Sequence, residues 1–287
     1  MQFDMNRTWS QALALVKANF QLLAIIAGVF VLLPALVIYI ANPEILQVLA
    51  LTDPQAVEAM LEPAMPRIAL FGLAAFLLQM IGHAALMALI SGERPTVGEA
   101  IVAGFRALPS VLGAVVVFFA GLIAAMMVLT FALSLIVTLI ATLLGNSAEA
   151  AAALATLIMM PVLLVFQLYL MVRFMMTLPV IVLEHQRNPL KALGRSRRLT
   201  KPRAWGILGF IFLLGIAYFV ILMVISIVLG ALGVLTGAPA TGGSILVFAL
   251  VISVIGALVA MLASGILVSI HQQLTGGTEP PDIEFNA

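Results

Sequence analysis

Six long apolar segments alternate along the chain with short polar segments, a pattern typical of a helical membrane protein. Each segment meets or exceeds the roughly 20 apolar residues that a helix needs to cross a bilayer. The first, residues 21–41, lacks a convincing small-residue cleavage site, so we expect a retained span and not a signal peptide. The predicted spans cover residues 20–41, 67–90, 109–144, 152–183, 202–235 and 245–272.

Prolines and polar residues divide this pattern further. Pro34 lies inside the first span, and Pro161 and Pro179 are expected to kink or break the fourth. The linker 42–66 has acidic residues but no Lys or Arg, and a short helix is expected near residues 53–62. The third span is long: roughly 35 residues would reach about 50 Å, against a hydrocarbon core of about 30 Å. It must therefore tilt, kink or project beyond the lipid.

A short amphipathic helix is predicted before the first, third and fifth spans. Thr8 with Gln11, and Thr96 with Glu99, are each spaced as a capping box. Before the fifth span, Asn188 is expected to cap a helix that begins at the following proline. Apolar residues recur at helical spacing in these segments, so we expect the helices to lie in the membrane interface.

The three short helices align with one another and predict an internal repeat. Ala12 and Ala100 occupy matching positions 88 residues apart, and Ala192 follows 92 residues later. Chance similarity among alanine-rich helices is the alternative, but near-equal spacing favours a repeat. The fold class expected is an all-α integral membrane protein with six transmembrane helices in three pseudo-repeated units. Each unit is an interfacial amphipathic helix plus a transmembrane hairpin, over residues 8–90, 96–183 and 188–272 of a single domain 1–274, followed by a flexible acidic tail, 275–287.

The composition agrees with a chain that has the bilayer as its solvent. It is 64% hydrophobic and 9% charged, with a mean hydropathy of +1.24, whereas soluble domains are about one-quarter charged. In lipid, backbone polar groups must be satisfied within helices or closed barrels. The chain has no cysteine, which excludes disulfides and thiolate chemistry.

The net charge of +1 conceals an uneven distribution of basic residues, and this distribution predicts the orientation. Arg67 alone falls on one predicted side, while both termini and most Lys and Arg fall on the other. We therefore expect a multi-pass protein of the inner (plasma) membrane with both termini cytoplasmic. Seven basic residues lie in the stretch 184–203, where the fourth span leads to the fifth: Arg187, Lys191, Arg195, Arg197, Arg198, Lys201 and Arg203.

Residues 173–209 resemble a bacterial family of multi-span membrane proteins, the membrane domain of glycerophosphoryl diester phosphodiesterase. The resemblance implies a helical membrane domain whose function is largely unknown, and the family name derives from members fused to a soluble phosphodiesterase domain. No His-Arg-Gly segment or acidic metal-binding cluster appears in this sequence, so we do not expect the enzymatic activity to transfer. The matching positions are Arg173, Pro179, Glu184, Ala192, Leu193, Arg195, Ser196, Leu199 and Thr200.

Two groups of residues are candidates for function. The seven basic residues can bind anionic lipid headgroups non-specifically or form a defined site for a phosphate group or a partner. The second group consists of polar side chains in or at the ends of spans, which either pair structurally or line a cavity. Its members are Gln79, His83, Gln167, Arg173 and Glu184.

The main functional hypothesis is a non-enzymatic scaffold or regulator that contacts anionic lipid, a protein partner or a second copy of the chain. The alternative is a transporter or lipid carrier that uses a polar site around Arg173 and His83. A membrane enzyme is disfavoured because the predicted spans contain no Asp or Glu for acid–base or metal chemistry. No metal or other cofactor is expected, and nucleic acid is not an expected partner because no aromatic residues interleave with the charges.

Overall fold

The computed structural model describes residues 3–48, 51, 53–91, 95–143, 148–236 and 242–276. Within these ranges every regular element is helical, which confirms the all-α prediction. Six described segments are long and apolar enough to cross a membrane: Phe20–Ala41, Pro54–Leu89, Val97–Thr142, Ala155–Leu183, Pro189–Val228 and Leu246–Thr275. The chain divides into two compact units: unit 1 comprises Met1–Phe3 and Pro109–Ile211, and unit 2 comprises Asp4–Leu108 and Phe212–Ala287.

Unit 2 begins with helix α1, Met5–Ala18, which starts earlier than predicted. Asp4 is its N-cap, and the Asp4 carboxylate accepts a hydrogen bond from the Arg7 amide at 3.0 Å. Thr8 lies inside the helix, where its hydroxyl donates to the Asp4 carbonyl at 2.8 Å. The capping box predicted at Thr8 and Gln11 is therefore wrong, because a better cap lies four residues upstream.

The first span consists of three helical pieces that follow one another without a gap. Pro34 cannot donate a backbone hydrogen bond, and a π-helical turn directly before α3 accommodates the missing bond. The pieces are α2, Phe20–Ala27; η1, Gly28–Leu32; and α3, Leu33–Ala41.

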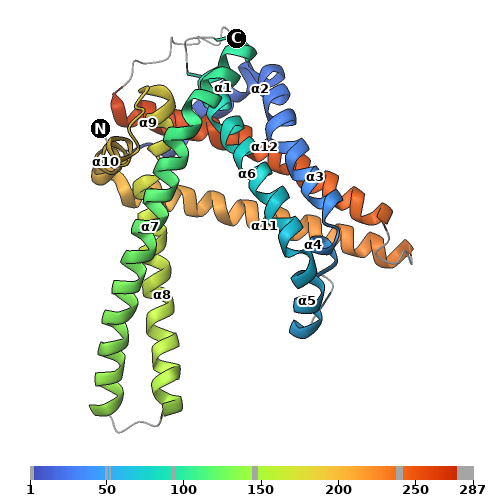
Figure 1. The fold of residues 1–287 in the computed structure, drawn as a ribbon. Coiled ribbons are helices and arrows are strands. Elements are labelled where there is room, and N and C mark those ends of the chain that lie inside the picture. Colours follow the sequence, from blue (N-terminus) through green and yellow to red (C-terminus); the bar gives the residue numbers. More distant parts are fainter. Residues whose placement is uncertain are drawn as a thin grey trace. The chain divides into compact units, whose positions relative to one another are not determined.

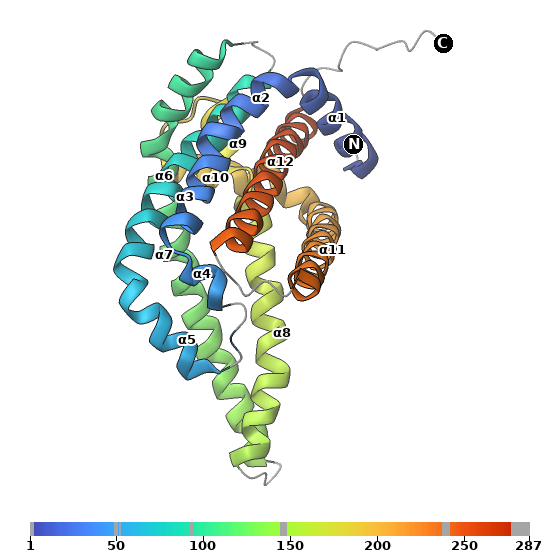
Figure 2. The same ribbon diagram turned by 90° about the vertical axis from the view of Figure 1, so that its right-hand side faces the viewer.

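Helices α6 (Met65–Leu89) and α12 (Gly242–Thr275) pack beside this first span in unit 2 (Figures 1 and 2). Helix α6 approaches η1 closely at Gly82, where a side chain would not fit: a Cβ added to Gly82 would lie 2.6 Å from the Cβ of Phe30. Before α6, the linker forms three short helices: α4, Glu44–Gln47; α5, Pro54–Leu61; and η3, Glu62–Ala64. The helix expected near residues 53–62 is thus confirmed.

Helix α7 runs without interruption over Val97–Leu143, a length of 47 residues. The capping box predicted at its start is confirmed: the Glu99 carboxylate accepts from the Thr96 amide at 2.8 Å, and Thr96 Oγ1 accepts from the Glu99 amide at 3.3 Å. The separate interfacial helix expected before Pro109 is wrong, since Pro109 lies inside the continuous helix. A proline removes only one hydrogen bond, and the helix-forming residues on both sides maintain the helix.

In unit 1, the part of α7 beyond Pro109 runs beside α8, Ala148–Phe174 (Figures 1 and 2). Pro161 lies within continuous α8, whereas the predicted break occurs before Pro179, between α8 and α9 (Thr177–Leu183). His185 has a left-handed backbone, with φ of 51°, at the turn from α9 toward the next helix. Helix α10 (Pro189–Thr200), η4 (Lys201–Arg203) and the start of α11 (Ala204–Thr236) complete the unit. The acidic tail predicted from residue 275 lies, beyond residue 276, outside the described residues.

Candidate functional site

Helix α10 packs against the end of α8 through one face. Its N-cap is Asn188, whose side chain accepts from the Lys191 amide at 3.1 Å, as predicted. The buried residues recur at helical spacing, so they share one side of the helix. They are Ala192, Leu193, Ser196 and Thr200.

Two hydroxyl groups on that face bind the backbone carbonyl of Arg173. Ser196 Oγ donates to this oxygen at 3.0 Å, and Thr200 Oγ1 donates to it at 3.1 Å. The last carbonyls of a helix have no amide partner within the helix. Here α8 ends at Phe174, so the two hydroxyls take the place of the missing amides and attach α10 to α8.

The Arg173 side chain is buried although it carries a charge. The residue is 6% exposed, and its Nη1 atom has no hydrogen-bond partner among the described residues. The guanidinium carbon lies 5.5 Å from the centre of the Tyr169 ring, one helical turn earlier on α8. The Tyr169 ring in turn lies 5.9 Å from the ring of Trp205, and Trp205 is 69% exposed. An aromatic pair thus connects the buried cation to the surface of unit 1.

The seven predicted lipid-binding residues all belong to unit 1, and most of them are exposed. Arg195 is tied to Glu184, with Nε and Oε2 at 3.1 Å. Glu184 lies at the exposed C-terminal end of α9. Arg195 and Arg203 are half-buried, while the exposed cations are Arg187, Lys191, Arg197, Arg198 and Lys201.

The remaining polar candidates belong to different units. Gln79 and His83 are half-buried one turn apart on α6 in unit 2, and Gln167 is half-buried on α8 in unit 1 with Arg173. A shared polar cavity therefore stays a prediction. Among the described residues, no group of three or more His, Asp or Glu could hold a metal ion.

In unit 2, α1 is held to the C-terminal end of α12 by side-chain hydrogen bonds. Gln11 Nε2 donates to Gln272 Oε1 at 2.6 Å, and Ser269 Oγ donates to Gln11 Oε1 at 3.1 Å. Gln273 Nε2 donates to Thr8 Oγ1 at 3.0 Å. These bonds place the described N-terminal and C-terminal segments of unit 2 together.

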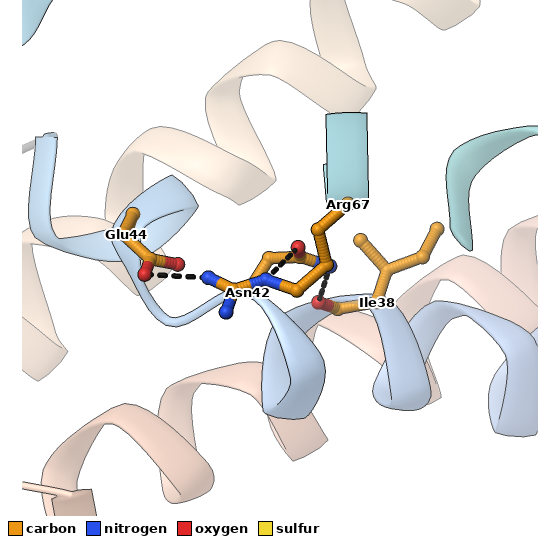
Figure 3. A network of polar contacts seen from close by, with 4 residues as sticks. All are labelled: Ile38, Asn42, Glu44 and Arg67. Atoms are coloured by element: carbon orange, nitrogen blue, oxygen red, sulfur yellow. Dashed lines mark hydrogen bonds and ion pairs between the residues drawn. The ribbon is translucent and has the colours of Figure 1, made fainter. Parts of the chain in front are cut away.

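A second polar network joins the ends of α3 and α6 in unit 2 (Figure 3). Asn42 is fully buried, and its Oδ1 atom accepts from Arg67 Nε at 3.0 Å. Arg67 Nη2 also pairs with Glu44 Oε1 at 2.6 Å. Hydrogen bonding to its own backbone amide, and then to Arg67, lowers the pKa of Glu44 below its ordinary value.

Sequence reasoning missed the partners in these networks. Tyr169 is one of three aromatic residues in an apolar run that also contains Phe166 and Phe174, and Asn42 is a linker residue in the sequence. A useful signal for Tyr169 was its position four residues before Arg173, which puts the two side chains on one face of α8. No comparable local pattern identifies Asn42, whose main partner lies 25 residues away.

The fold and these networks define the class: a multi-span, all-helical membrane protein. A family model described as the membrane domain of glycerophosphoryl diester phosphodiesterase matches residues 149–279, a little under half of the chain. The match confirms the resemblance inferred from the sequence, and it includes Arg173 and all of α10. No curated protein and no solved structure matches the chain.

Proposed function

We propose that the protein is a non-enzymatic scaffold or regulator of the bacterial inner membrane whose basic segment binds anionic lipid. The observation that carries this proposal is the two-sided character of α10. One face is buried against α8, while the exposed cations form a group that we term the basic belt: Arg187, Lys191, Arg197, Arg198 and Lys201.

The belt has the charge and the apolar neighbours that an interfacial lipid site requires. Each Lys or Arg near an anionic surface contributes about 1 kcal/mol of attraction. Leu190, next to Lys191, is 64% exposed and adds an apolar group that can enter the headgroup region. Arg195 contributes less, because its charge is already neutralised by Glu184.

Lipid retention after purification tests this function. We expect the triple variant Arg197→Gln/Arg198→Gln/Lys201→Gln to retain several-fold less phosphatidylglycerol than the parent protein, measured by native mass spectrometry. The matched control neutralises three exposed cations elsewhere: Arg7, Lys17 and Arg106. Retention should also fall as salt is raised, because exposed charges are screened. Equal retention by the belt variant and the control would contradict the proposal.

The proposed scaffold has three sequence repeats, each beginning with a short segment that packs on a span of the preceding repeat. This segment is a separate helix in the first and third repeats and the first turns of α7 in the second. Several contacts support this arrangement. Ala12, Ala100 and Ala192, which align in the sequence, are all 0% exposed. Ser196 binds the carbonyl of Arg173, 23 residues earlier.

Equivalent contacts occur at the other two short segments, within unit 2. Gly104 lies so close to Ile81 that a Cβ added to the glycine would be 2.6 Å from the Ile81 carbonyl oxygen. Ile81 precedes Gly104 by 23 residues, as Arg173 precedes Ser196. A Cβ added to Gly265 would lie 3.0 Å from the carbonyl oxygen of Ala12. Ile81, Arg173 and Gly265 follow one another at intervals of 92 residues, the same interval that separates Ala100 from Ala192.

In the proposed orientation, all three short segments and both termini face the cytoplasm. The absence of native cysteine makes single-cysteine labelling a direct test. With a membrane-impermeant maleimide, we expect Glu58→Cys to react in cells whose outer membrane alone is permeabilised. Ser10→Cys, Val102→Cys and Arg197→Cys should react only after the inner membrane is opened. Labelling of Ser10→Cys and Arg197→Cys from opposite sides would contradict the arrangement.

A further inference from the structure

Arg173 is the buried cation of unit 1 for which the described residues supply no carboxylate. An ionised group within a span is normally paired or faces water. Its Nη1 atom lacks a hydrogen-bond partner among the described residues, and the aromatic face of Tyr169 replaces only part of the lost solvation. Glu184, eleven residues further along the chain, is directed to Arg195.

The aromatic residues beside Arg173 are of the kind found at the membrane interface. Trp and Tyr concentrate at the interface between hydrocarbon and headgroups. Tyr169 lies directly beside the guanidinium, and Trp205 lies beside Tyr169 while remaining largely exposed. The α10 hydroxyls hold the Arg173 backbone in place. A Tyr–Trp pair of this kind would place the guanidinium near the level of the lipid headgroups.

We propose that Arg173, framed by Tyr169 and Trp205, is a binding site for a phosphate group, with the phosphodiester of a membrane phospholipid as the ligand. The guanidinium offers a planar set of N–H donors that matches two phosphate oxygens. The proposal deepens the lipid-binding function above, because it adds one defined headgroup site to the non-specific belt. The two sites differ in burial, so salt screens the belt and affects Arg173 much less.

Trp205 provides a local reporter for this site. The chain has two tryptophans, so a Trp9→Phe background leaves Trp205 as the only one. In detergent at high salt, we expect short-chain phosphatidylglycerol to change Trp205 emission in a saturable way. Short-chain diacylglycerol, which lacks the phosphate, should have no such effect. Inorganic phosphate is the third ligand. If it competes with phosphatidylglycerol for the Trp205 response, the site is assigned to free phosphate; if it does not compete, the site is assigned to the lipid phosphodiester.

Variants of Arg173 give the decisive comparison. Arg173→Met should weaken the phosphatidylglycerol response at least about tenfold, and Arg173→Lys about fivefold, because Lys keeps the charge without the planar fork. Arg106→Gln, which removes an exposed cation of unit 2, should leave the response unchanged. An equal response in Arg173→Met, or an equal response to diacylglycerol, would overturn the proposal.

Thermal unfolding in lipid-free detergent separates a ligand site from a structural role. Removing an unpaired buried charge should leave the melting temperature of Arg173→Met equal to or above that of the parent. A lower melting temperature, or failure to fold, would show that the fold itself requires Arg173 and would overturn the proposal. The belt variant distinguishes the two lipid hypotheses, since it should lose only the salt-sensitive part of lipid binding.

Discussion

Arg67 in unit 2 and Arg173 in unit 1 occupy opposite electrostatic situations. The Arg67 side chain is 46% exposed, and it bonds both a carboxylate and a buried amide. Arg173 is 6% exposed, and its guanidinium faces an aromatic ring. The more accessible charge therefore has a carboxylate partner, and the more buried charge has none among the described residues.

This difference separates two uses of arginine in a membrane protein. Arg67 joins the end of α3 to the start of α6, and all its interactions with Asn42 and Glu44 lie within unit 2. At the start of α6, its charge is paired locally with Glu44. Arg173 is fixed through its backbone, and its buried Nη1 atom has no hydrogen-bond partner among the described residues.

The largest expected effect comes from releasing the Arg173 backbone. The double variant Ser196→Ala/Thr200→Val removes both hydroxyl donors and leaves a buried carbonyl without them. We expect the free energy of unfolding to fall by about 3 kcal/mol, near the upper end for an unsatisfied buried group. Chemical denaturation in mixed micelles, followed by circular dichroism, measures this change.

A matched control is available on α7. Ser134 donates only to the carbonyl of Phe131 in its own helix, so Ser134→Ala should change stability by well under 1 kcal/mol. If the double variant were as stable as this control, the attachment of α10 to α8 would not depend on the hydroxyls. The contrast between a fixed backbone and an available side chain at Arg173 would then fail.

A smaller loss of stability is expected when Arg67 is replaced and its two partners remain. Arg67→Met leaves the buried Asn42 Oδ1 atom without its donor and Glu44 without its cation. We expect a loss of about 1–2 kcal/mol, because a buried acceptor then goes unsatisfied. The same substitution at Arg173 should cause no loss. A thermal shift assay on both methionine variants compares them directly, and equal destabilisation would remove the distinction between the two arginines.

Local patterns in the sequence were sufficient to predict the spans and two of the helix starts. The caps at Thr96 and Asn188 depend on residues three positions apart, so spacing alone reveals them. The cap at Asp4 was missed because Thr8 offered an equally regular pattern four residues later. The continuity of α7 through Pro109 was missed because a proline within a helix and a proline at its start look alike in sequence.

The partners of the two arginines could not be predicted in the same way. Arg173 was recognised as unusual because a charge in an apolar run is conspicuous. Its relation to Trp205 depends on how α8, α10 and α11 pack, and that packing joins residues far apart in the chain. Asn42 and Glu44 likewise reach Arg67 only after α3 and α6 have come together.

The smallest expected effect is the pH dependence of the Glu44–Arg67 pair. The pKa of Glu44 is lowered in the folded state, so its contribution to stability is fully present above the ordinary glutamate pKa, about 4.3. That contribution is lost as pH falls through the lowered value, because the carboxylate becomes protonated and the pair is broken. Solvent screens a partly exposed pair, so we expect less than about 1 kcal/mol. The measurement is the difference in melting temperature between the parent and Glu44→Gln. This difference in melting temperature should shrink as pH is lowered from neutral to below the ordinary glutamate pKa. A difference that stays constant with pH would show that the carboxylate contributes through packing and not through its charge.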